Sequence, residues 1–370
     1  MEKVKEGRLR SLDALRGLDM LFICGLSGLI AKICVLCGSP TGWLATQMKH
    51  VEWDGFVHHD TIFPLFLFIA GVTFPFSLAR QQADGRSTWK IWLRTLRRGL
   101  VLVLLGMVYN GLLKFDFAHL RVFSVLGRIG LAWMLASWIW MFFGMRMRIV
   151  WLMAILLGVG ALSAYLVAPD FPDASPFTKN GNIACWFDRT FFKGHTYSKH
   201  YDPEGLLCSI PAIGTALLGM FAGAFIRWER EGLTGNKKTL CLFGAAAVLG
   251  VAAYAWGRVL PINKALWSST FVLAAGSYSF AVLALFYWMA DVMGWYRGMF
   301  FFEVVGLNSI TIYMAQRLID FDRTNKFLFS GVASLFSTKE ASAVVLAAGY
   351  VVVVWLFLYF LHRHKAYLKV

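Results

Sequence analysis

Long uninterrupted apolar segments are the feature that most constrains this sequence. They run for about 20 residues, the length of helix that crosses a hydrocarbon layer of about 30 Å. The segments are continuously apolar and do not alternate with polar residues, so they predict helices and not the strands of a β-barrel. Only 15% of the residues are charged, whereas soluble domains carry about 25%. The sequence therefore predicts an all-α, polytopic membrane bundle.

The apolar segments predict about ten membrane-spanning helices in a single domain over residues 1–370. The first of them contains Asp13, Arg16 and Asp19, which argues against a cleaved signal peptide. A further apolar segment at 327–337 is too short to span and is expected to be re-entrant or interfacial. The ten expected spans are approximately 12–36, 59–80, 92–113, 122–143, 147–168, 205–228, 239–257, 266–290, 299–319 and 341–361.

Basic residues predict the orientation of the bundle. Lys and Arg gather in the N-terminal tail, in the 80–98 and 227–238 loops and in the C-terminal tail. Because such residues collect on the cytoplasmic side of membrane proteins, we expect both termini to lie inside. The same rule accounts for the net charge of +15, so no nucleic-acid partner is expected. The expected partner is the lipid bilayer that surrounds the helices.

The largest polar insertion, residues 169–204, is then expected outside the membrane. Its prolines and glycines predict a loop with little helix, and its aromatic and charged residues favour an ordered cap. Four cysteines also map near the outer side, where disulfides are permitted: Cys34, Cys37, Cys185 and Cys208. Their spacing leaves any pairing open.

His50 and Asp60 are the first candidate for chemistry, near the outer end of the second expected span. They combine a titratable imidazole with a carboxylate that can orient it. The alternative of a zinc site would use His58 and His59 as well. Those two adjacent residues point in different directions on a helix, and no metal-binding spacing accompanies them, so no metal is expected.

Charged and polar residues elsewhere in the apolar segments leave two interpretations open, because charge at membrane depth is costly and often functional. Arg16 either neutralises Asp13 and Asp19 within one helix or faces a cavity where it can bind phosphate. A second set either lines a pocket on the outer side or anchors helix ends in the interface: Arg121, Arg128, Asp202, Glu204, Asn263, Lys264, Glu303, Asn308 and Ser309.

Seven motifs, in the same order along the chain, resemble the catalytic membrane domain of the heparan-α-glucosaminide N-acetyltransferase family and its bacterial homologues. One is the run KHVEWDG at 49–55. The others lie at 8–17, 60–71, 121–130, 201–205, 263–268 and 306–310.

The resemblance implies an enzyme that transfers an acetyl group from cytosolic acetyl-CoA to a glucosamine amine across the membrane. The family's active-site histidine corresponds to His50 and the nearby aspartate to Asp60. Ser27 stands where the family has an asparagine, and Gly127 where it has a glutamine. For a bacterial homologue, the expected location is the inner membrane, with the active site facing the periplasm.

The remaining candidate residues divide between the acceptor and the donor. Asn263 or Lys264 is expected to stabilise the oxyanion, with Asp202, Glu204, Trp267, Ser268 and Asn308 near the amino-sugar or glycan acceptor. The candidates for binding CoA are Arg16, Arg97, Arg98, Arg121 and Arg128. A homodimer remains an open assembly state. A secondary transporter of amino sugars and an O-acyltransferase of envelope polysaccharide remain the alternative functions.

Overall fold

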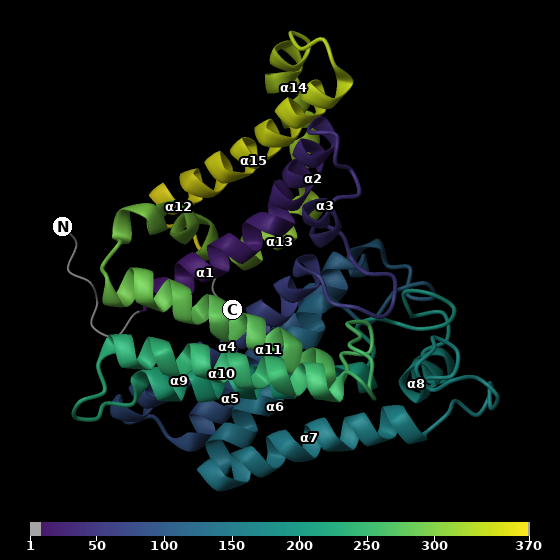
Figure 1. Ribbon diagram of the computed structural model, residues 1–370, viewed down its shortest axis with the longest axis vertical. Coiled ribbons are helices and arrows are strands. Elements are labelled where there is room, and N and C mark those ends of the chain that lie inside the picture. Colours follow the sequence, from purple (N-terminus) through teal and green to yellow (C-terminus); the bar gives the residue numbers. More distant parts are fainter. Residues whose placement is uncertain (1–8, 369–370) are drawn as a thin grey trace. The chain divides into compact units, whose positions relative to one another are not determined.

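The computed structural model describes residues 9–368, and these form helices joined by loops (Figure 1). Within this part of the chain the only β pairing consists of two isolated bridges, and no strand is formed. Several helices are long and apolar enough to cross a membrane. The prediction of an all-α, polytopic helical protein is confirmed.

The chain divides into two compact units. Of the described residues, the first comprises 9–52, 57–62 and 282–368, and the second comprises 53–56 and 63–281. Helices α1 (Arg10–Leu21), α2 (Ser27–Leu36), α3 (Trp43–Gln47), α12 (Tyr296–Gly306), α13 (Ser309–Leu318), α14 (Phe321–Ala333) and α15 (Lys339–Arg363) belong to the first. Helices α5 (Thr88–Tyr109), α6 (Val125–Phe142), α7 (Met145–Tyr165), α8 (Ile183–Phe191), α9 (Ile210–Arg227) and α10 (Gly235–Trp256) belong to the second. Helices α4 (His58–Ala83) and α11 (Ser269–Tyr287) contribute to both.

The number of spans differs from the expected ten. The described residues contain eight helices that meet both the length and the hydropathy expected of a span. A ninth is present if α12 and α13, which are bent by 48° around residues 307–308, count as one. The segment expected to span at 92–113 is α5, which is long enough but carries more charge than a typical span. Its basic residues are Lys90, Arg94, Arg97 and Arg98.

The first span bends next to the candidate catalytic residues. A π-helical turn at Phe22–Leu26 separates α1 from α2, and Gly25 within it has φ = 112°. Residues with a β-carbon rarely adopt this conformation, so glycine permits the bend here. The bend ends at Ser27, whose hydroxyl contacts His59 in the first turn of α4.

Close helix crossings in both units depend on glycine. In the first unit α1 crosses α12, and a β-carbon on Gly17 would lie 1.8 Å from the Phe302 carbonyl oxygen. In the second unit α4 crosses α9, and a β-carbon on Gly71 would lie 2.2 Å from the Ala216 carbonyl oxygen. Membrane helices gain no hydrophobic energy by leaving lipid, so close van der Waals contact between backbones is a main source of their association.

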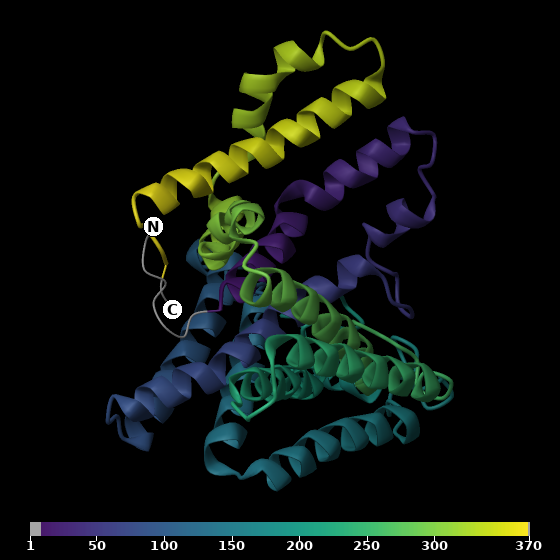
Figure 2. The same cartoon turned by 60° about the vertical axis from the view of Figure 1, so that its left-hand side comes forward.

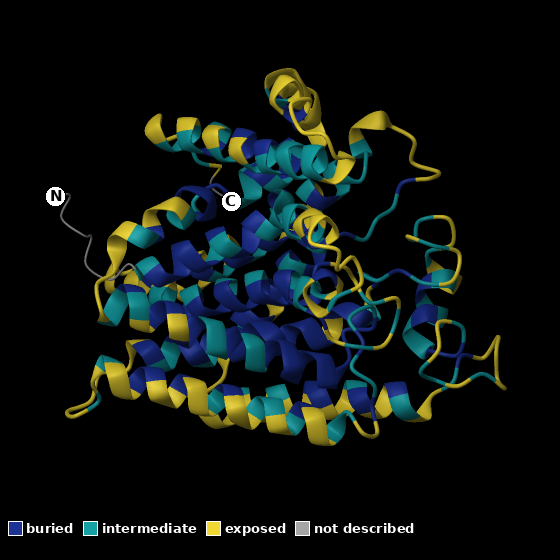
Figure 3. Cartoon of the chain, turned by 45° about the horizontal axis from the view of Figure 1, so that its top comes forward, coloured by how far each residue is buried: buried dark blue, intermediate teal, exposed yellow. Residues whose placement is uncertain are grey.

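The helices of the second unit differ in how much of each is buried. Within the most apolar 18-residue stretch of each helix, 78% of the residues are buried in Leu207–Arg227, whereas only 17% are buried in α7 and 22% in α10. Figure 3 shows exposed residues along the outer side of α10. The α9 helix therefore lies at the centre of this unit, with α7 and α10 at its surface.

The apolar segment around 327–337 forms most of α14, which folds back along α15 (Figures 1 and 2). Asn325 donates its side-chain amide to the Leu346 carbonyl oxygen at 2.9 Å. Gly349 provides room for this contact, since a β-carbon there would lie 2.5 Å from the Asn325 amide oxygen.

The insertion at 169–204 is more ordered than a plain loop, because it contains the nine-residue helix α8. The Asn182 side chain caps this helix by accepting the Ala184 N–H at 3.0 Å. An isolated bridge between Val167 and Asn182 fastens the start of the insertion. We refer to residues 167–206 as the cap.

Substituting Gly17 by alanine tests the crossing of α1 and α12. Because the new methyl group would overlap the Phe302 carbonyl, we expect Gly17→Ala to destabilise the protein by about 1–3 kcal/mol or more, measured as a fall in Tm. The matched control is Gly28→Ala, since nothing lies within 4 Å of a β-carbon at this exposed helical position. The control is expected to keep or slightly raise Tm. Equal Tm values for the two variants would contradict the close crossing.

Candidate active site

His50 and Asp60 form a hydrogen-bonded pair in the first unit. The Nδ1 atom of His50 lies 2.6 Å from Asp60 Oδ1, and the Val51 N–H points to Asp60 Oδ2 at 3.5 Å. The Asp60 side chain is 1% exposed, whereas that of His50 is 49% exposed. A carboxylate at Nδ1 favours the tautomer whose Nδ1 carries the proton and whose Nε2 carries the lone pair. The pair thus presents an oriented, accessible imidazole.

A second histidine lies against this pair. The rings of His50 and His59 are 4.4 Å apart, and His59 Nδ1 lies 3.1 Å from Ser27 Oγ. The Gln47 side chain accepts the His58 N–H at 2.8 Å, which fixes the start of α4. Sequence reasoning did not predict these contacts, although His59 was visible beside Asp60 and Ser27 was noted as a departure from the family. Within residues 9–368 no group of three or more His, Cys, Asp or Glu side chains could hold a metal ion.

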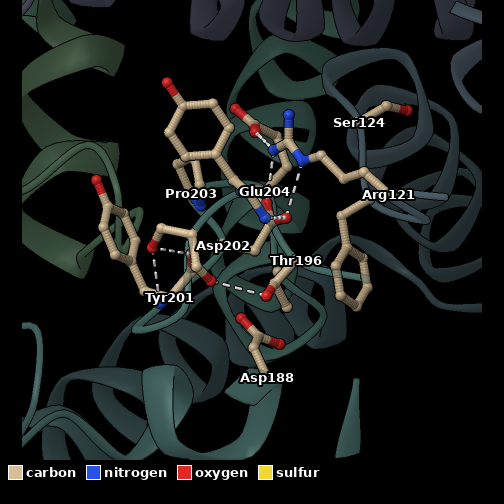
Figure 4. Close-up of polar contacts among 12 residues, drawn as sticks. Arg121, Ser124, Asp188, Thr196, Tyr201, Asp202, Pro203 and Glu204 are labelled. Carbon is tan, nitrogen blue, oxygen red and sulfur yellow. Dashed lines mark hydrogen bonds and ion pairs between the residues drawn. The ribbon is translucent and has the colours of Figure 1, made fainter. Parts of the chain in front are cut away.

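Arg121 contacts Asp202 and Glu204 of the cap, all within the second unit (Figure 4). Arg121 donates from Nε and from a terminal nitrogen to the two Asp202 oxygens, at 2.8 and 2.6 Å, and also bonds to Glu204. Burial works against the charge on Arg121, but the two carboxylates outweigh it and raise the pKa of Arg121. Asp202 also accepts the N–H groups of Tyr197 and Glu204. This cluster fastens the cap to the segment before α6.

Arg128 and Trp267 are also brought together in the second unit. The Arg128 guanidinium lies 4.7 Å from the Trp267 ring centroid and donates to the Pro203 carbonyl oxygen. Its Nε donates to Ser209 at 3.3 Å, and Trp267 donates to Thr215 at 3.1 Å. Both motif residues are buried.

Asn263 and Ser268 shape the loop before α11. Ser268 Oγ accepts the Asn263 N–H at 3.0 Å, and the Asn263 side chain bonds to Asp54 and to the Leu266 N–H. Gly55 donates to the Ile262 carbonyl oxygen at 2.9 Å. The loop therefore holds residues 53–56, which follow His50 closely in the chain. Lys264 lies 5.8 Å from the Phe63 ring centroid.

A shallow pocket of about 450 Å³ opens on the cap and is lined by Trp53, Thr178, Lys179, Asn180 and His200. The Trp53 indole donates to the Phe177 carbonyl oxygen at 2.7 Å, and the Lys179 ammonium lies 5.4 Å from the indole ring centroid. An aromatic ring beside amide, hydroxyl and ammonium groups suits a polar ligand with an apolar face.

The arginines expected to bind CoA lie in both units. Arg16 on α1 is 3.4 Å from Asp13, so this part of the expected trio forms. Asp19 is buried, and its Oδ2 atom has no hydrogen-bond partner. On α5, Arg97 is exposed, and Arg98 lies 4.4 Å from the Trp133 ring centroid. Asn308 is buried at the bend between α12 and α13, where its carbonyl accepts the Ile312 N–H at 2.9 Å.

Asp188 of α8 was not a predicted site residue, yet it is buried in the cap beside Gly205. Its Oδ1 accepts the Leu206 N–H at 3.2 Å, while its Oδ2 has no hydrogen-bond partner. Burial, reinforced by Asp202, raises the pKa of Asp188 to about 7, against the lowering effect of the Leu206 N–H and Arg128. The signal available in the sequence was a carboxyl directly after two aromatic residues, Trp186 and Phe187.

All six cysteines are free thiols. Cys185 and Cys208 are buried in one cluster with Leu266, and burial raises the pKa of the Cys185 thiol to about 12. Such a thiol stays protonated and is a poor nucleophile near neutral pH.

These observations define a multi-pass helical membrane protein with an oriented histidine–carboxylate pair. Comparison with known proteins shows which proteins the chain is similar to. A domain of unknown function, DUF5009, matches residues 8–112, which include His50 and Asp60. The heparan-alpha-glucosaminide N-acetyltransferase of Mus musculus is 25% identical over 367 residues, covering 85% of this chain and 54% of the mouse protein.

The human enzyme of the same name is 26% identical over 370 residues, covering 85% of this chain and 53% of the human protein. The chain is thus a distant homologue of heparan-alpha-glucosaminide N-acetyltransferase, and the predicted resemblance is confirmed. It spans about half the length of these curated relatives.

The raised pKa of Asp188 predicts a pH-dependent stability. Between the ordinary value of 3.8 and about 7, the folded protein holds a proton that the unfolded chain releases. Stability should therefore fall as pH rises from about 4 to about 7, by up to about 1.4 kcal/mol per pH unit from this group, and should level off above 7. Asn mimics the neutral carboxyl, so Asp188→Asn should remove this contribution from a series of Tm measurements between pH 4 and 8. An unchanged slope in the variant would refute the assignment.

Proposed function

We propose that this chain is a membrane acetyltransferase that transfers an acetyl group from acetyl-CoA to the amine of an amino sugar. The single observation that carries the proposal is the 2.6 Å contact between a half-exposed His50 and a buried Asp60. Similarity to two N-acetyltransferases over 85% of the chain supports the same reaction.

His50 can act by either of two routes. In a ternary complex, Nε2 removes a proton from the amine as its nitrogen attacks the thioester carbonyl, the C–N bond forms and the CoA thiolate leaves. In a two-step route, Nε2 attacks the thioester, CoA leaves, and the amine then takes the acetyl group from the imidazole. Asp60 serves both routes, because it orients the ring and stabilises the imidazolium.

The oxyanion that forms at the thioester carbonyl requires a hydrogen-bond donor. The Asn263 amide is bonded to Asp54 and to the Leu266 N–H, which gives Asn263 a role in the loop. We assign the donor role to Lys264, because its ammonium group can stabilise a negative charge. Asn263 and Ser268 then act by shaping the loop that carries Lys264. Trp267 and Asn308 are both buried, and each is assigned a positioning role within its own unit.

The acceptor is assigned to the cap side. Trp53 follows His50 by three residues, so their Cα atoms lie within about 11 Å of one another whatever the local conformation. The pocket around Trp53 offers an aromatic surface for a sugar ring, with Asn180 and Thr178 as polar partners. Asp202 and Glu204 support this pocket indirectly, because they hold the cap through Arg121.

The donor is assigned to the opposite side, which carries the basic loops and is expected to be cytosolic. In this arrangement the pantetheine arm reaches through the bundle, and the acceptor is a periplasmic amino sugar or glycan in a bacterial inner membrane. Arg16, Arg97 and Arg98 are the candidate ligands of the CoA phosphates, since arginine binds phosphate with a planar fork. Arg121 and Arg128 donate hydrogen bonds to residues of the cap, so we assign them the role of positioning the cap.

Loss of His50 tests the reaction directly. In proteoliposomes loaded with acetyl-CoA and given external glucosamine, His50→Ala should lower the rate of CoA release by about 100-fold or more. Asp60→Asn should also impair turnover, because it changes the hydrogen bond that orients the ring. His119→Ala is the control, since its side chain is 81% exposed and pairs with Asp116.

Near-normal turnover in His50→Ala would contradict the proposal. Sugar uptake without CoA release would indicate a transporter, and an ester product in mass spectrometry would indicate an O-acyltransferase.

Arg16→Ala tests the donor side. Removing one charge-assisted contact to phosphate should raise the KM for acetyl-CoA about tenfold to a hundredfold and leave the KM for the amino sugar unchanged. Asp13→Asn is the matched control, because it removes the neighbour of Arg16 without removing the guanidinium. If Arg16→Ala lowers Tm with no change in the donor KM, Arg16 serves only to neutralise Asp13.

A further inference from the structure

A cavity of about 970 Å³ lies in the second unit, where α4, α6 and α9 end and α7 begins. Its walls include two indole rings, from Trp140 and Trp228, and the aromatic ring of Phe221. Three charged residues also line it: Arg148, Arg227 and Glu229. None of the residues that line this cavity is assigned a role in the proposed acetyl transfer.

Arg148 is held in one orientation within this cavity. Its guanidinium carbon lies 4.1 Å from the Trp140 ring centroid, and a terminal nitrogen donates to the Trp140 carbonyl oxygen at 2.6 Å. Its Nε is buried and has no hydrogen-bond partner. Burying an unsatisfied donor is costly, so this N–H indicates a place for an acceptor atom from a ligand.

The charges of the residues that line the cavity indicate which kind of acceptor group the ligand carries. Arg148 and Arg227 outnumber Glu229, which leaves one net positive charge. Arginine binds phosphate oxygens through two parallel N–H groups. A phosphodiester carries a single negative charge and matches this lining, whereas the several phosphate charges of CoA exceed it.

The position of the cavity indicates that its ligand is a lipid. Three of the four helices end here, the fourth begins here, and all four belong to candidate spans, so the cavity lies at a membrane–water interface. From Met145 and Arg148, α7 continues with exposed apolar side chains: Ile149, Val150, Met153 and Leu157. Because little of α7 is buried, an acyl chain can lie along it while the headgroup occupies the cavity.

We propose that this cavity binds the phosphodiester of a membrane glycerophospholipid, with Arg148 Nε–H and Arg227 as its donors. The bound lipid joins the ends of α4, α6, α7 and α9 at one face of the membrane. Since a ligand that binds only the folded state raises its stability, the lipid should also raise Tm in proportion to the logarithm of its concentration.

The test uses the full chain, purified in detergent and stripped of lipid, with dioleoyl-phosphatidylglycerol as the probe. Native mass spectrometry counts bound lipid, and Tm is followed as lipid is added. Arg148→Gln should raise the apparent Kd about tenfold to a hundredfold, the usual effect of losing a charge-assisted hydrogen bond. Arg146→Gln is the matched control, because it removes the same charge from the same turn of α7 at an exposed position outside the cavity.

Arg227→Gln provides a second variant in case Arg148→Gln fails to fold, since Arg227 lies at the exposed end of α9. It too should weaken lipid binding. Dioleoylglycerol, which lacks phosphate, should give neither a bound lipid adduct nor a rise in Tm.

Three results would overturn the proposal. One is equal loss of lipid in the Arg146 and Arg148 variants, which would show non-specific attraction to charge. The second is binding of dioleoylglycerol as tight as that of the phospholipid. The third is dependence on Arg148 for CoA but not for phosphatidylglycerol, which would assign the cavity to a nucleotide.

Discussion

Close contact between helix backbones is the interaction on which the rest of the structure depends. In a membrane, apolar side chains gain little by meeting one another, so helices associate where small residues let them approach. Gly17 and Gly306 provide such a crossing between α1 and α12, and Gly71 and Gly219 between α4 and α9. The second crossing fixes α4, the helix that begins with His58, His59 and Asp60. Asp60, the partner of His50, therefore lies in the first turn of a helix that is held further along its length.

Charge has the complementary role outside the apolar segments. Arg121 binds two carboxylates of the cap, and Arg128 binds the backbone between them, so the cap is fastened to the start of α6 by buried polar contacts. Removing one partner of such a cluster would leave a buried charge uncompensated, which costs about 3–5 kcal/mol. The fold therefore constrains these residues whether or not they contact substrate.

Sequence reasoning predicted the pairing of His50 with Asp60, because the motifs that contain them carry a specific family resemblance. It did not predict that His59 and Ser27 lie beside them, since Ser27 belongs to a different helix and reaches the site only through the bend at Gly25. It also missed Asp188 and the orientation of Arg148, whose surroundings come from segments far apart in the chain. Burial and partners of this kind depend on distant contacts that no local pattern contains.

The sequence by itself determined that this is a helical membrane protein, because runs of about 20 apolar residues have no other stable form in a bilayer. It also predicted that His50 and Asp60 pair, through residue type and motif. Only the tertiary structure decided where the spans bend: the first bends at Gly25, and α12 and α13 are bent by 48° around residues 307–308. The physical reason is that hydropathy is a sum over one segment, whereas a bend, a buried charge or a cavity is set by the neighbours that fold against it.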